Sequence, residues 1–439
     1  MSEASDIAVP NSTKSVAYPR LTLDALLQLA RDCGADDCGA VSLDEPAFDE
    51  DRAYILKAFP ATRTMLALVS RTHREPIRSP AKSIANNEWH RVGHKIDDIA
   101  AEIVGRLEKQ SIKALNPPMA FPMEMDNIPG RTWIVSHKRV AEAAGVGHMG
   151  IHRSVIHPQF GSFILLNTVL IAVELDHESR PLDANPCLEC KLCVAACPVG
   201  AVKPDGYFDF SACLNHNYQQ FMGGFSNWVE DIADSRSAKD FRSRSSYSEN
   251  ITRWQSLSYG PNYNAANCIA VCPAGNDVIG LYAENKQQHI QETLIPLQEK
   301  AEPLYVVRDS DAADFAARRY PHKQLRYVRA GGRALSVQSF LFGIKLTFQR
   351  GKSKNLNAVY HFTYTGEDSA NATIVIRNQR LSVVDGHEGA PDIRIRVDGR
   401  QWVRFLSKET SIARLLLSRA LRIKGNPRLF LAFSKCFPS

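Results

Sequence analysis

The chain has 439 residues, of which 44% are hydrophobic and 23% charged, a composition that suits an ordinary soluble protein of two or three domains. The start of the sequence lacks the basic and apolar regions of a signal peptide, and no apolar run is long and uninterrupted enough to span a membrane. Ten cysteines in a chain of this kind therefore indicate metal ligation in a reducing cytoplasm rather than a disulfide framework.

The net charge of +6 conceals an asymmetry between the two ends of the chain. Residues 301–439 contain 24 Lys and Arg against 11 Asp and Glu, whereas the remainder contains 29 against 36. A basic C-terminal domain suggests an anionic partner, such as peripheral contact with an anionic membrane, although many basic surfaces are only solvated. Because no zinc finger or RNP-type motif is present, no specific nucleic acid is expected.

In chain order, the first elements alternate between helix and strand. The apolar spacing predicts helices over 21–33 and 88–109, buried strands over 64–70 and 163–175, and a loop over 71–85. This alternation predicts an α/β class for the first part. His90 and His94 lie one helical turn apart, which suits a metal, but without the glutamate of an HEXXH motif we interpret them as surface residues.

A helix followed by glycines is predicted over 140–150, where Gly145, Gly147 and Gly150 form a Gly-X-Gly-X-X-Gly string. A dinucleotide fingerprint would follow a strand and open a helix, whereas these glycines follow a helix. We interpret the segment as a glycine-terminated helix and a loop that approaches a ligand closely.

The most specific motif is a run of four cysteines ending in Pro198, with the spacing C-x2-C-x2-C-x3-C-P of a bacterial two-cluster ferredoxin. In that pattern the fourth cysteine binds the other cluster. By this rule one cluster is bound by Cys187, Cys190, Cys193 and Cys272, and a second by Cys197, Cys213 and Cys268. A zinc knuckle would instead need two C-x2-C pairs with a longer spacer.

The rest of the chain is predicted to change character twice. Residues 223–260 form a polar and aromatic insertion, either a functional lid or a surface excursion, and 299–319 are interpreted as a linker. Short strands are then predicted over 358–364, 372–376, 381–384 and 393–397, and helices over 401–406, 411–421 and 427–436. The apolar helix at Leu415 and Leu416 is expected to cover the sheet or to line an apolar cavity with it.

The part from about 21 to 278 resembles epoxyqueuosine reductase and, more distantly, the reductive dehalogenases. The resemblance rests on the sequences AEAAGVGHMG at 141–150 and PQFGSF at 158–163, and on the cysteine pattern. It implies a nitroreductase-like α/β domain and a two-cluster ferredoxin domain, with base-off cobalamin above two [4Fe-4S] clusters. Residues 320–437 resemble the sterol carrier protein type 2 (SCP2) domain, an α+β fold that binds lipids or other apolar molecules.

Two positions depart from the pattern of the reductases. Ala265 stands where the second cluster motif has its first cysteine, so the second cluster is either [3Fe-4S] or a [4Fe-4S] cluster with one iron held by another group. His216, three residues after Cys213, is a candidate for that group or simply a polar neighbour. The family's proton-donating aspartate falls at Arg131, which leaves Asp126 and His137 as the nearest titratable candidates.

The resulting hypothesis divides the chain into an α/β domain (19–180), a double-cluster domain (181–298), the linker, and an SCP2-like domain (320–439). The corrinoid would contact Gly145, Gly147, Gly150 and His152. The expected function is corrinoid-dependent reduction of an apolar or lipid-like substrate, with electrons from a soluble donor of the ferredoxin or flavodoxin type. The alternative is a non-catalytic iron–sulfur electron-transfer protein fused to a lipid-binding module.

Overall fold

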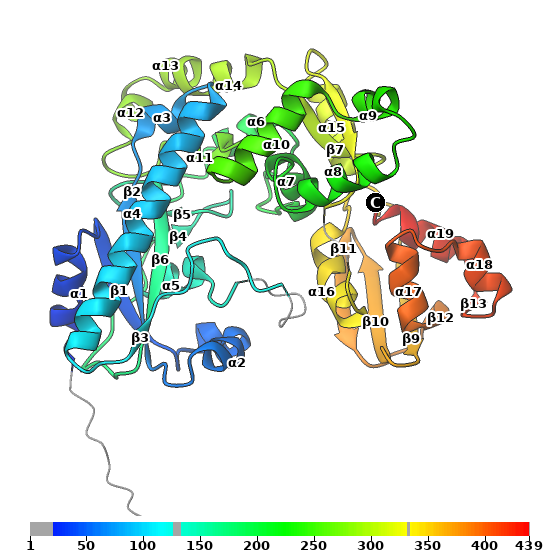
Figure 1. Cartoon of the computed structure of the whole chain (residues 1–439), viewed down its shortest axis with the longest axis horizontal. Helices are drawn as coiled ribbons and strands as arrows, with labels where there is room; N and C mark the ends of the chain where they lie inside the picture. The colour runs from blue at the N-terminus through cyan, green and yellow to red at the C-terminus, as the bar shows by residue number, and fades with distance from the viewer. Residues whose placement is uncertain (1–20, 126–132, 332–333, 439) are drawn as a thin grey trace, which may run out of the picture.

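The computed structural model describes residues 21–125, 133–331 and 334–438 (Figure 1). Its first part is built on an antiparallel sheet with the strand order β1-β2-β6-β3. These strands are β1 (Asp37–Ser42), β2 (Thr64–Arg71), β3 (Ala114–Leu115) and β6 (Ile164–Ile171). Two of them confirm the predicted strands, and the mixed α/β character of the chain is confirmed.

Helices cover both faces of this sheet. On one face Leu66 and Leu68 pack against α1 (Leu23–Asp32) and the long α4 (Lys82–Lys109). On the other, Met65 packs with α2 (Asp49–Ala58) and α5 (His137–Ala143). Burial on both faces explains why β2 is an uninterrupted apolar run rather than an alternating one.

The predicted helices 21–33 and 88–109 are confirmed as α1 and α4. The loop expected over 71–85 is only partly right, because it contains the short helix α3 (Arg74–Arg78) and α4 already begins at Lys82. On α4, His94 is exposed as expected, whereas Nε2 of the half-buried His90 lies 2.8 Å from the carbonyl oxygen of Pro261.

The middle part consists of short helices and one small hairpin, β4 (His148–Met149) with β5 (Val155–Ile156). Its helices are α6 (Leu192–Ala196), α7 (Phe210–Asn217), α8 (Gly223–Ala233), α9 (Ala238–Arg244), α10 (Tyr247–Tyr259), α11 (Asn267–Ala270), α12 (Gly280–Glu284), α13 (Lys286–His289) and α14 (Ile295–Glu299). The insertion 223–260 is therefore helical. Glu249 in it pairs with Arg326 at 2.8 Å, which attaches the insertion to the strand β8 (Leu325–Val328).

Residues 299–319 are not a linker. They contain β7 (Leu304–Val307) and α15 (Asp311–Arg319), and β7 pairs in parallel with β8 (Leu325–Val328). All four side chains of β7 are buried, and Leu304 and Val306 belong to the same apolar cluster as Cys193 and Cys197. The structural boundary of the C-terminal domain therefore lies after β8. A four-residue apolar run is too short for its periodicity to reveal a strand.

The C-terminal domain is a five-stranded sheet with the order β11-β10-β9-β12-β13, antiparallel except for the parallel pair β9–β12. Its strands are β9 (Ala358–Thr365), β10 (Ala370–Arg377), β11 (Arg380–Asp385), β12 (Ile393–Asp398) and β13 (Leu421–Gly425). The four strands predicted from the sequence are confirmed. The helix predicted over 411–421 is wrong in its second half, where α18 (Ile412–Leu417) ends and β13 follows.

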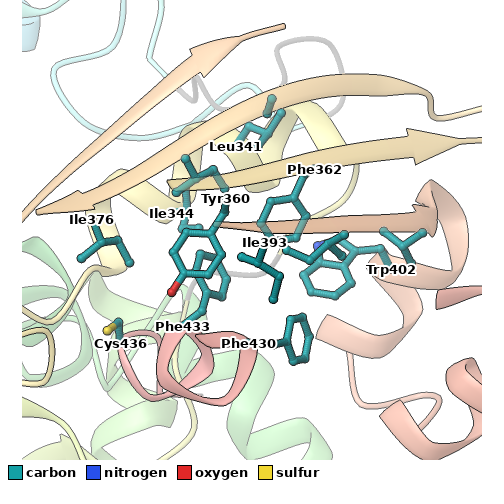
Figure 2. Packing of buried hydrophobic residues seen from close by; sticks show 14 of the residues in the cluster. Leu341, Ile344, Tyr360, Phe362, Ile376, Ile393, Trp402, Phe430, Phe433 and Cys436 are labelled. Carbon is teal, nitrogen blue, oxygen red and sulfur yellow. The ribbon is translucent and has the colours of Figure 1, made fainter. Parts of the chain in front are cut away.

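Aromatic side chains fill the space between this sheet and the helices α16 (Val337–Thr347), α17 (Gly399–Leu406) and α19 (Pro427–Lys435) (Figure 2). The rings of Tyr360 and Phe362 lie 5.0 and 5.4 Å from that of Phe433, and the Tyr360 hydroxyl donates to the Leu429 carbonyl at 3.0 Å. Of the leucines on α18, Leu415 is buried and covers this interior, whereas Leu416 is 47% and Leu417 86% exposed.

Among the described residues, none of the helices combines the length and the apolar character needed to cross a bilayer.

Candidate metal centre

The first three cysteines of the run are carried by a tightly curled loop that enters α6. Glu189 and Lys191 have positive φ values of 50° and 64°, a conformation that residues with a side chain adopt rarely. Such backbone strain persists where the surrounding structure imposes it, often at ligand sites. The positive φ values at these two residues bend the loop that carries Cys187, Cys190 and Cys193.

These three cysteines share one hollow with a cysteine from a distant segment. The hollow is lined by Cys187, Cys190, Cys193 and Cys272, and also by His152. Cys272 follows α11, far along the chain from the run. The structure thus brings together the four cysteines that the ferredoxin spacing assigns to one cluster. They surround a volume, as the ligands of a polynuclear cluster do.

The second set, Cys197, Cys213 and Cys268, is also assembled. Burial raises the pKa of the Cys213 thiol, and the neighbouring thiolates of Cys268 and Cys197 raise it further. Burial likewise raises the pKa of Cys268 to about 12, with contributions from Cys197 and Cys272. Thiols in this environment need a nearby positive charge to ionise, and bound iron would supply it.

The two sets adjoin each other. Burial raises the pKa of the Cys193 thiol, and the largest charge contribution comes from Cys268 of the second set. The helices that carry these two cysteines, α6 and α11, are joined by a hydrogen bond of 3.3 Å from Nδ2 of Asn267 to the carbonyl of Ala196. Two clusters bound here would therefore be neighbours.

Backbone N–H groups point at sulfur atoms of both sets. The N–H of Ala201 donates to Sγ of Cys197 at 3.1 Å. In the first set, backbone N–H groups of Leu192 and Ala274 act on Cys190 and Cys272 and lower the thiol pKa against the larger effect of burial. Hydrogen bonds to sulfur are one of the means by which proteins set the potential of a cluster.

Lys138, on α5 of the α/β part, belongs to the site although no sequence pattern indicated it. Burial lowers the pKa of its ammonium group, and the charges of Cys213 and Cys268 oppose that shift. Its Nζ donates a hydrogen bond of 2.6 Å to the carbonyl of Arg153. No spacing or motif links Lys138 to cysteines so far along the chain.

His152, assigned to the corrinoid from the resemblance, lies on the wall of the cysteine hollow. Its Nδ1 accepts a hydrogen bond of 3.1 Å from the Ser154 N–H, while the buried Nε2 has no partner among the described residues. Burial lowers the pKa of the His152 ring to about 4, so that the ring is neutral at physiological pH. A neutral imidazole that accepts at Nδ1 carries its proton on Nε2.

The three glycines assigned to the corrinoid are required by contacts within the chain. A Cβ on Gly145, which has φ +69°, would lie 2.0 Å from the Arg180 carbonyl oxygen, and one on Gly147 would lie 2.4 Å from Val155. A Cβ on Gly150 would meet the side chain of Ile156 at 2.7 Å. These contacts account for the glycine string, and its role in corrinoid binding stays a prediction.

His216 and Ala265 lie near the second set. The buried Nδ1 of His216 accepts from the backbone N–H of Tyr305 at 3.2 Å, and Nε2 has no partner among the described residues. The Ala265 N–H donates to the side-chain oxygen of Asn217 at 2.9 Å. To bind iron through Nε2, His216 would first have to lose the proton that this arrangement places there. Its role as a ligand stays a prediction.

The structure describes only one of the two proposed proton donors. Asp126 lies outside the described residues. His137 has both ring nitrogens engaged, Nδ1 with the Thr168 hydroxyl at 2.9 Å and Nε2 with the Pro118 carbonyl at 3.1 Å. Burial lowers the pKa of His137 to about 4. These contacts are those of a structural histidine, and catalysis by either residue stays a prediction.

Within the described ranges, no three His, Cys, Asp or Glu side chains converge closely enough to hold a single metal ion. A zinc knuckle would place its sulfur atoms about 2.3 Å from one point. The lining of the hollow by four cysteines instead fits a larger group, such as a cubane cluster.

Comparison with known proteins finds two separate similarities. Residues 345–438 match the family model of the SCP-2 sterol transfer family. The chain is also similar to epoxyqueuosine reductases, for example that of Synechococcus sp. (strain RCC307), with 29% identity over 170 residues. This alignment covers 38% of the chain and 49% of the relative, so that the chain spans about half the length of the reductase.

Solved structures of a reductive dehalogenase and of an epoxyqueuosine reductase match at lower sequence identity. A reductive dehalogenase studied for B12-dependent dehalogenation matches at 16% identity and a TM-score of 0.33, covering 41% of this chain and 25% of its own. An epoxyqueuosine reductase with an epoxyqueuosine-modified tRNA-Tyr stem loop matches at 17% identity and a TM-score of 0.31, covering 46% of this chain and 57% of its own.

Proposed function

We propose that the protein is an iron–sulfur oxidoreductase of the epoxyqueuosine reductase type that carries two cysteine-bound clusters. The observation that carries this proposal is the hollow in which Cys272 joins Cys187, Cys190 and Cys193. This hollow supports the proposal because its four cysteines come from separate segments and are still the set that the two-cluster ferredoxin spacing assigns to one cluster.

In this proposal the two cysteine sets would hold the clusters, and the clusters would supply one-electron transfer between a soluble donor of the ferredoxin or flavodoxin type and a buried reaction centre. The chain contributes the arrangement of the two cysteine sets, in which Cys193 and Cys268 lie near enough for their charges to interact. Burial limits the access of water to Cys193, Cys197 and Cys272, and the ammonium group of Lys138 offsets negative charge beside the second set. His152 lies on the wall of the hollow, and its unpartnered Nε2–H would be available to donate a hydrogen bond to a sulfur of the first cluster.

A corrinoid, when bound, would supply the reducing chemistry at carbon, as the resemblance to the dehalogenases implies. Contacts within the chain already account for Gly145 and Gly147, and His152 lies on the wall of the cysteine hollow. Binding of the corrinoid by these residues therefore stays a prediction, and no step is assigned to it.

The C-terminal domain is proposed to present an apolar or lipid-like substrate, as its match to the sterol transfer family suggests. Two polar groups in its apolar interior, the Tyr364 hydroxyl and Nε1 of Trp402, have no partner among the described residues. A bound molecule with one polar end could satisfy them. Being part of the same chain would raise the effective concentration of that substrate at the reaction centre.

A tRNA substrate is the competing possibility, because a related reductase has been solved with a modified tRNA stem loop. The expectation that no specific nucleic acid is bound is therefore to be tested directly. In this chain Ala265 replaces a cluster cysteine and Arg131 stands where the proton-donating aspartate is expected, which favours a different substrate.

The deciding experiment is anaerobic purification followed by iron and sulfide analysis, electron paramagnetic resonance and titration with cobalamin. Two clusters together with bound cobalamin would support the reductase, and two redox-active clusters without cobalamin would support the electron carrier fused to a lipid-binding module. Zinc in place of iron would overturn both. Binding of an epoxyqueuosine-containing stem loop, compared with a fluorescent fatty acid, separates the two substrate classes.

A further inference from the structure

The outer face of the C-terminal sheet carries a two-by-two array of cations. Arg394 on β12 lies directly opposite Lys424 on β13, and Arg396 lies directly opposite Arg422. All four side chains are exposed, on the side of the sheet opposite the buried Ile393 and Ile395. We call these four residues the basic face.

No carboxylate of the described residues neutralises the charge of the basic face. None of its four side chains forms an ion pair with a carboxylate of the described residues. The sequence around β13 supplies none either, since residues 410–438 contain six Lys and Arg and no Asp or Glu. Like charges directly opposite each other destabilise a sheet. An array of this kind therefore points to an anionic partner outside the domain.

Exposed leucines precede β13 of the basic face by a few residues in the chain. Helix α18 leads through a short turn into β13, and at its end Leu416 is 47% and Leu417 86% exposed. Figure 1 shows α18 and β13 together at the end of the C-terminal domain that points away from the rest of the chain. The described residues leave these two leucines largely uncovered, whereas their neighbour Leu415 is buried.

Protruding leucines together with unpaired cations fit an anionic bilayer surface better than RNA. Basic residues are attracted by acidic headgroups, and leucines enter the boundary between headgroups and acyl chains. Single-stranded RNA is instead recognised by stacking of bases on exposed aromatic rings. The strand next to the basic face, β9, presents Thr363 and the buried His361 on that side, and no exposed Phe, Tyr or Trp.

We propose that the basic face, with Leu416 and Leu417, is a docking surface for membranes that contain anionic phospholipid. It would bring the C-terminal domain to the bilayer from which an apolar molecule is taken. The inference stands on the contacts of β12, β13 and α18, and it holds whether or not the clusters form.

The test is co-sedimentation of the full-length holoprotein with vesicles of phosphatidylcholine alone or with phosphatidylserine at about 30%. Binding is expected only to the anionic vesicles and to fall as salt is raised. Since each basic residue near an anionic surface strengthens binding about fivefold, Arg394→Gln with Arg396→Gln should weaken it about 30-fold. Leu417→Ser should weaken it about tenfold.

Matched controls are available on the same sheet. Arg377 and Arg380 are also exposed arginines in a directly opposed pair, at the far hairpin of β10 and β11, and their double change to Gln alters net charge equally. Leu335→Ser removes another strongly exposed leucine, which is 74% exposed and lies before α16. These controls should bind like the unaltered protein. An equal loss in the Arg377 and Arg380 variant, or retained vesicle binding by the Arg394 and Arg396 variant, would overturn the proposal. So would loss of tRNA binding in that variant without any vesicle binding.

Discussion

The backbone N–H of Ser154 donates a hydrogen bond to Nδ1 of His152 across 3.1 Å, and this contact determines which ring nitrogen carries the proton. The proton is on Nε2, which is buried, has no partner among the described residues and belongs to a ring on the wall of the cysteine hollow. A buried donor without an acceptor costs about 1–3 kcal/mol. A cluster sulfur in the hollow would remove that cost.

Replacing His152 with Ala is therefore expected to lower the reduction potential of the first cluster. A hydrogen bond to sulfur stabilises the more negative, reduced state, and its loss is expected to shift the potential down on the order of 50 mV, about 1 kcal/mol for one electron. The measurement is a redox titration followed by electron paramagnetic resonance. His148→Ala, in the same loop but paired with Glu142, is the matched control and should leave the potential unchanged. An unchanged potential in His152→Ala would contradict the assigned role.

Ala265→Cys is expected to complete the ligands of the second cluster. Cys197, Cys213 and Cys268 supply three thiolates, and the family pattern places a fourth at this position. In the unaltered protein the second cluster should then give a three-iron signal in electron paramagnetic resonance, and the variant should convert it to a four-iron signal. A pair of fully cysteine-bound clusters in the unaltered protein would show that the ligand assignment is wrong.

His216→Ala distinguishes a ligand from a structural residue. Because Nδ1 of His216 accepts the Tyr305 N–H, the variant is expected to loosen the contact between α7 and β7 and to leave the type of the second cluster unchanged. Paired measurement of thermal stability and of the cluster spectrum separates the two roles. A change from a four-iron to a three-iron spectrum with unaltered stability would identify His216 as the missing ligand.

The sequence predicted the pieces of this site that depend on local spacing. The C-x2-C-x2-C-x3-C-P run predicted how the cysteines divide into two sets, because the reach of a short loop limits which sulfurs can share a cluster. It missed Lys138, since the position of an α5 side chain beside Cys213 depends on how two distant segments pack. It also did not indicate that His152 lies beside the cysteines, because the orientation of the ring depends on a contact with Ser154 that leaves no periodic signal.

The elements of the fold were predicted to a similar extent. Long amphipathic or apolar segments such as α4 and β2 were found, because their period repeats many times. The short strands β7 and β13 were missed, one as part of a linker and one as the end of a helix. Both are four or five residues long, and their strand conformation depends on pairing with β8 and β12 respectively.

Glu88→Gln should destabilise the α/β part near neutral pH. The buried carboxylate accepts from the His73 N–H at 2.6 Å and from Arg91 at 2.8 and 3.1 Å. Burial alone would raise the pKa of Glu88, but these hydrogen bonds outweigh it and the pKa is lowered. Loss of bonds to a charged group costs about 1.5–3 kcal/mol, which urea unfolding of variant and unaltered protein would measure.

The loss of unfolding free energy caused by Glu88→Gln should become smaller as the pH falls. An unfolded glutamate titrates near pH 4.3, and the folded Glu88 titrates below that. Its stabilisation is therefore fully present above about pH 5 and is lost as the pH falls through the folded pKa. Glu102→Gln, which removes an exposed pair with Arg106 on the same helix, is the control and should change little. A penalty that grows toward acid pH would refute the assignment.

Leu415 and Leu417, two residues apart on α18, should respond oppositely to truncation. Leu415 is 1% exposed and packs on the aromatic interior, so Leu415→Ala is expected to cost about 2–4 kcal/mol of unfolding free energy. Leu417 is 86% exposed, and Leu417→Ala should stay within about 0.5 kcal/mol. Urea unfolding of a fragment that begins at Ala334 measures both, because the apolar cluster of this domain starts at Val337 and should fold without the cysteine-bearing part. If Leu417→Ala proved as costly as Leu415→Ala, that leucine would be packed in solution and could not enter a membrane. A small cost at Leu417, combined with weaker vesicle binding, would mean that its exposure serves contact with a partner rather than the stability of the domain.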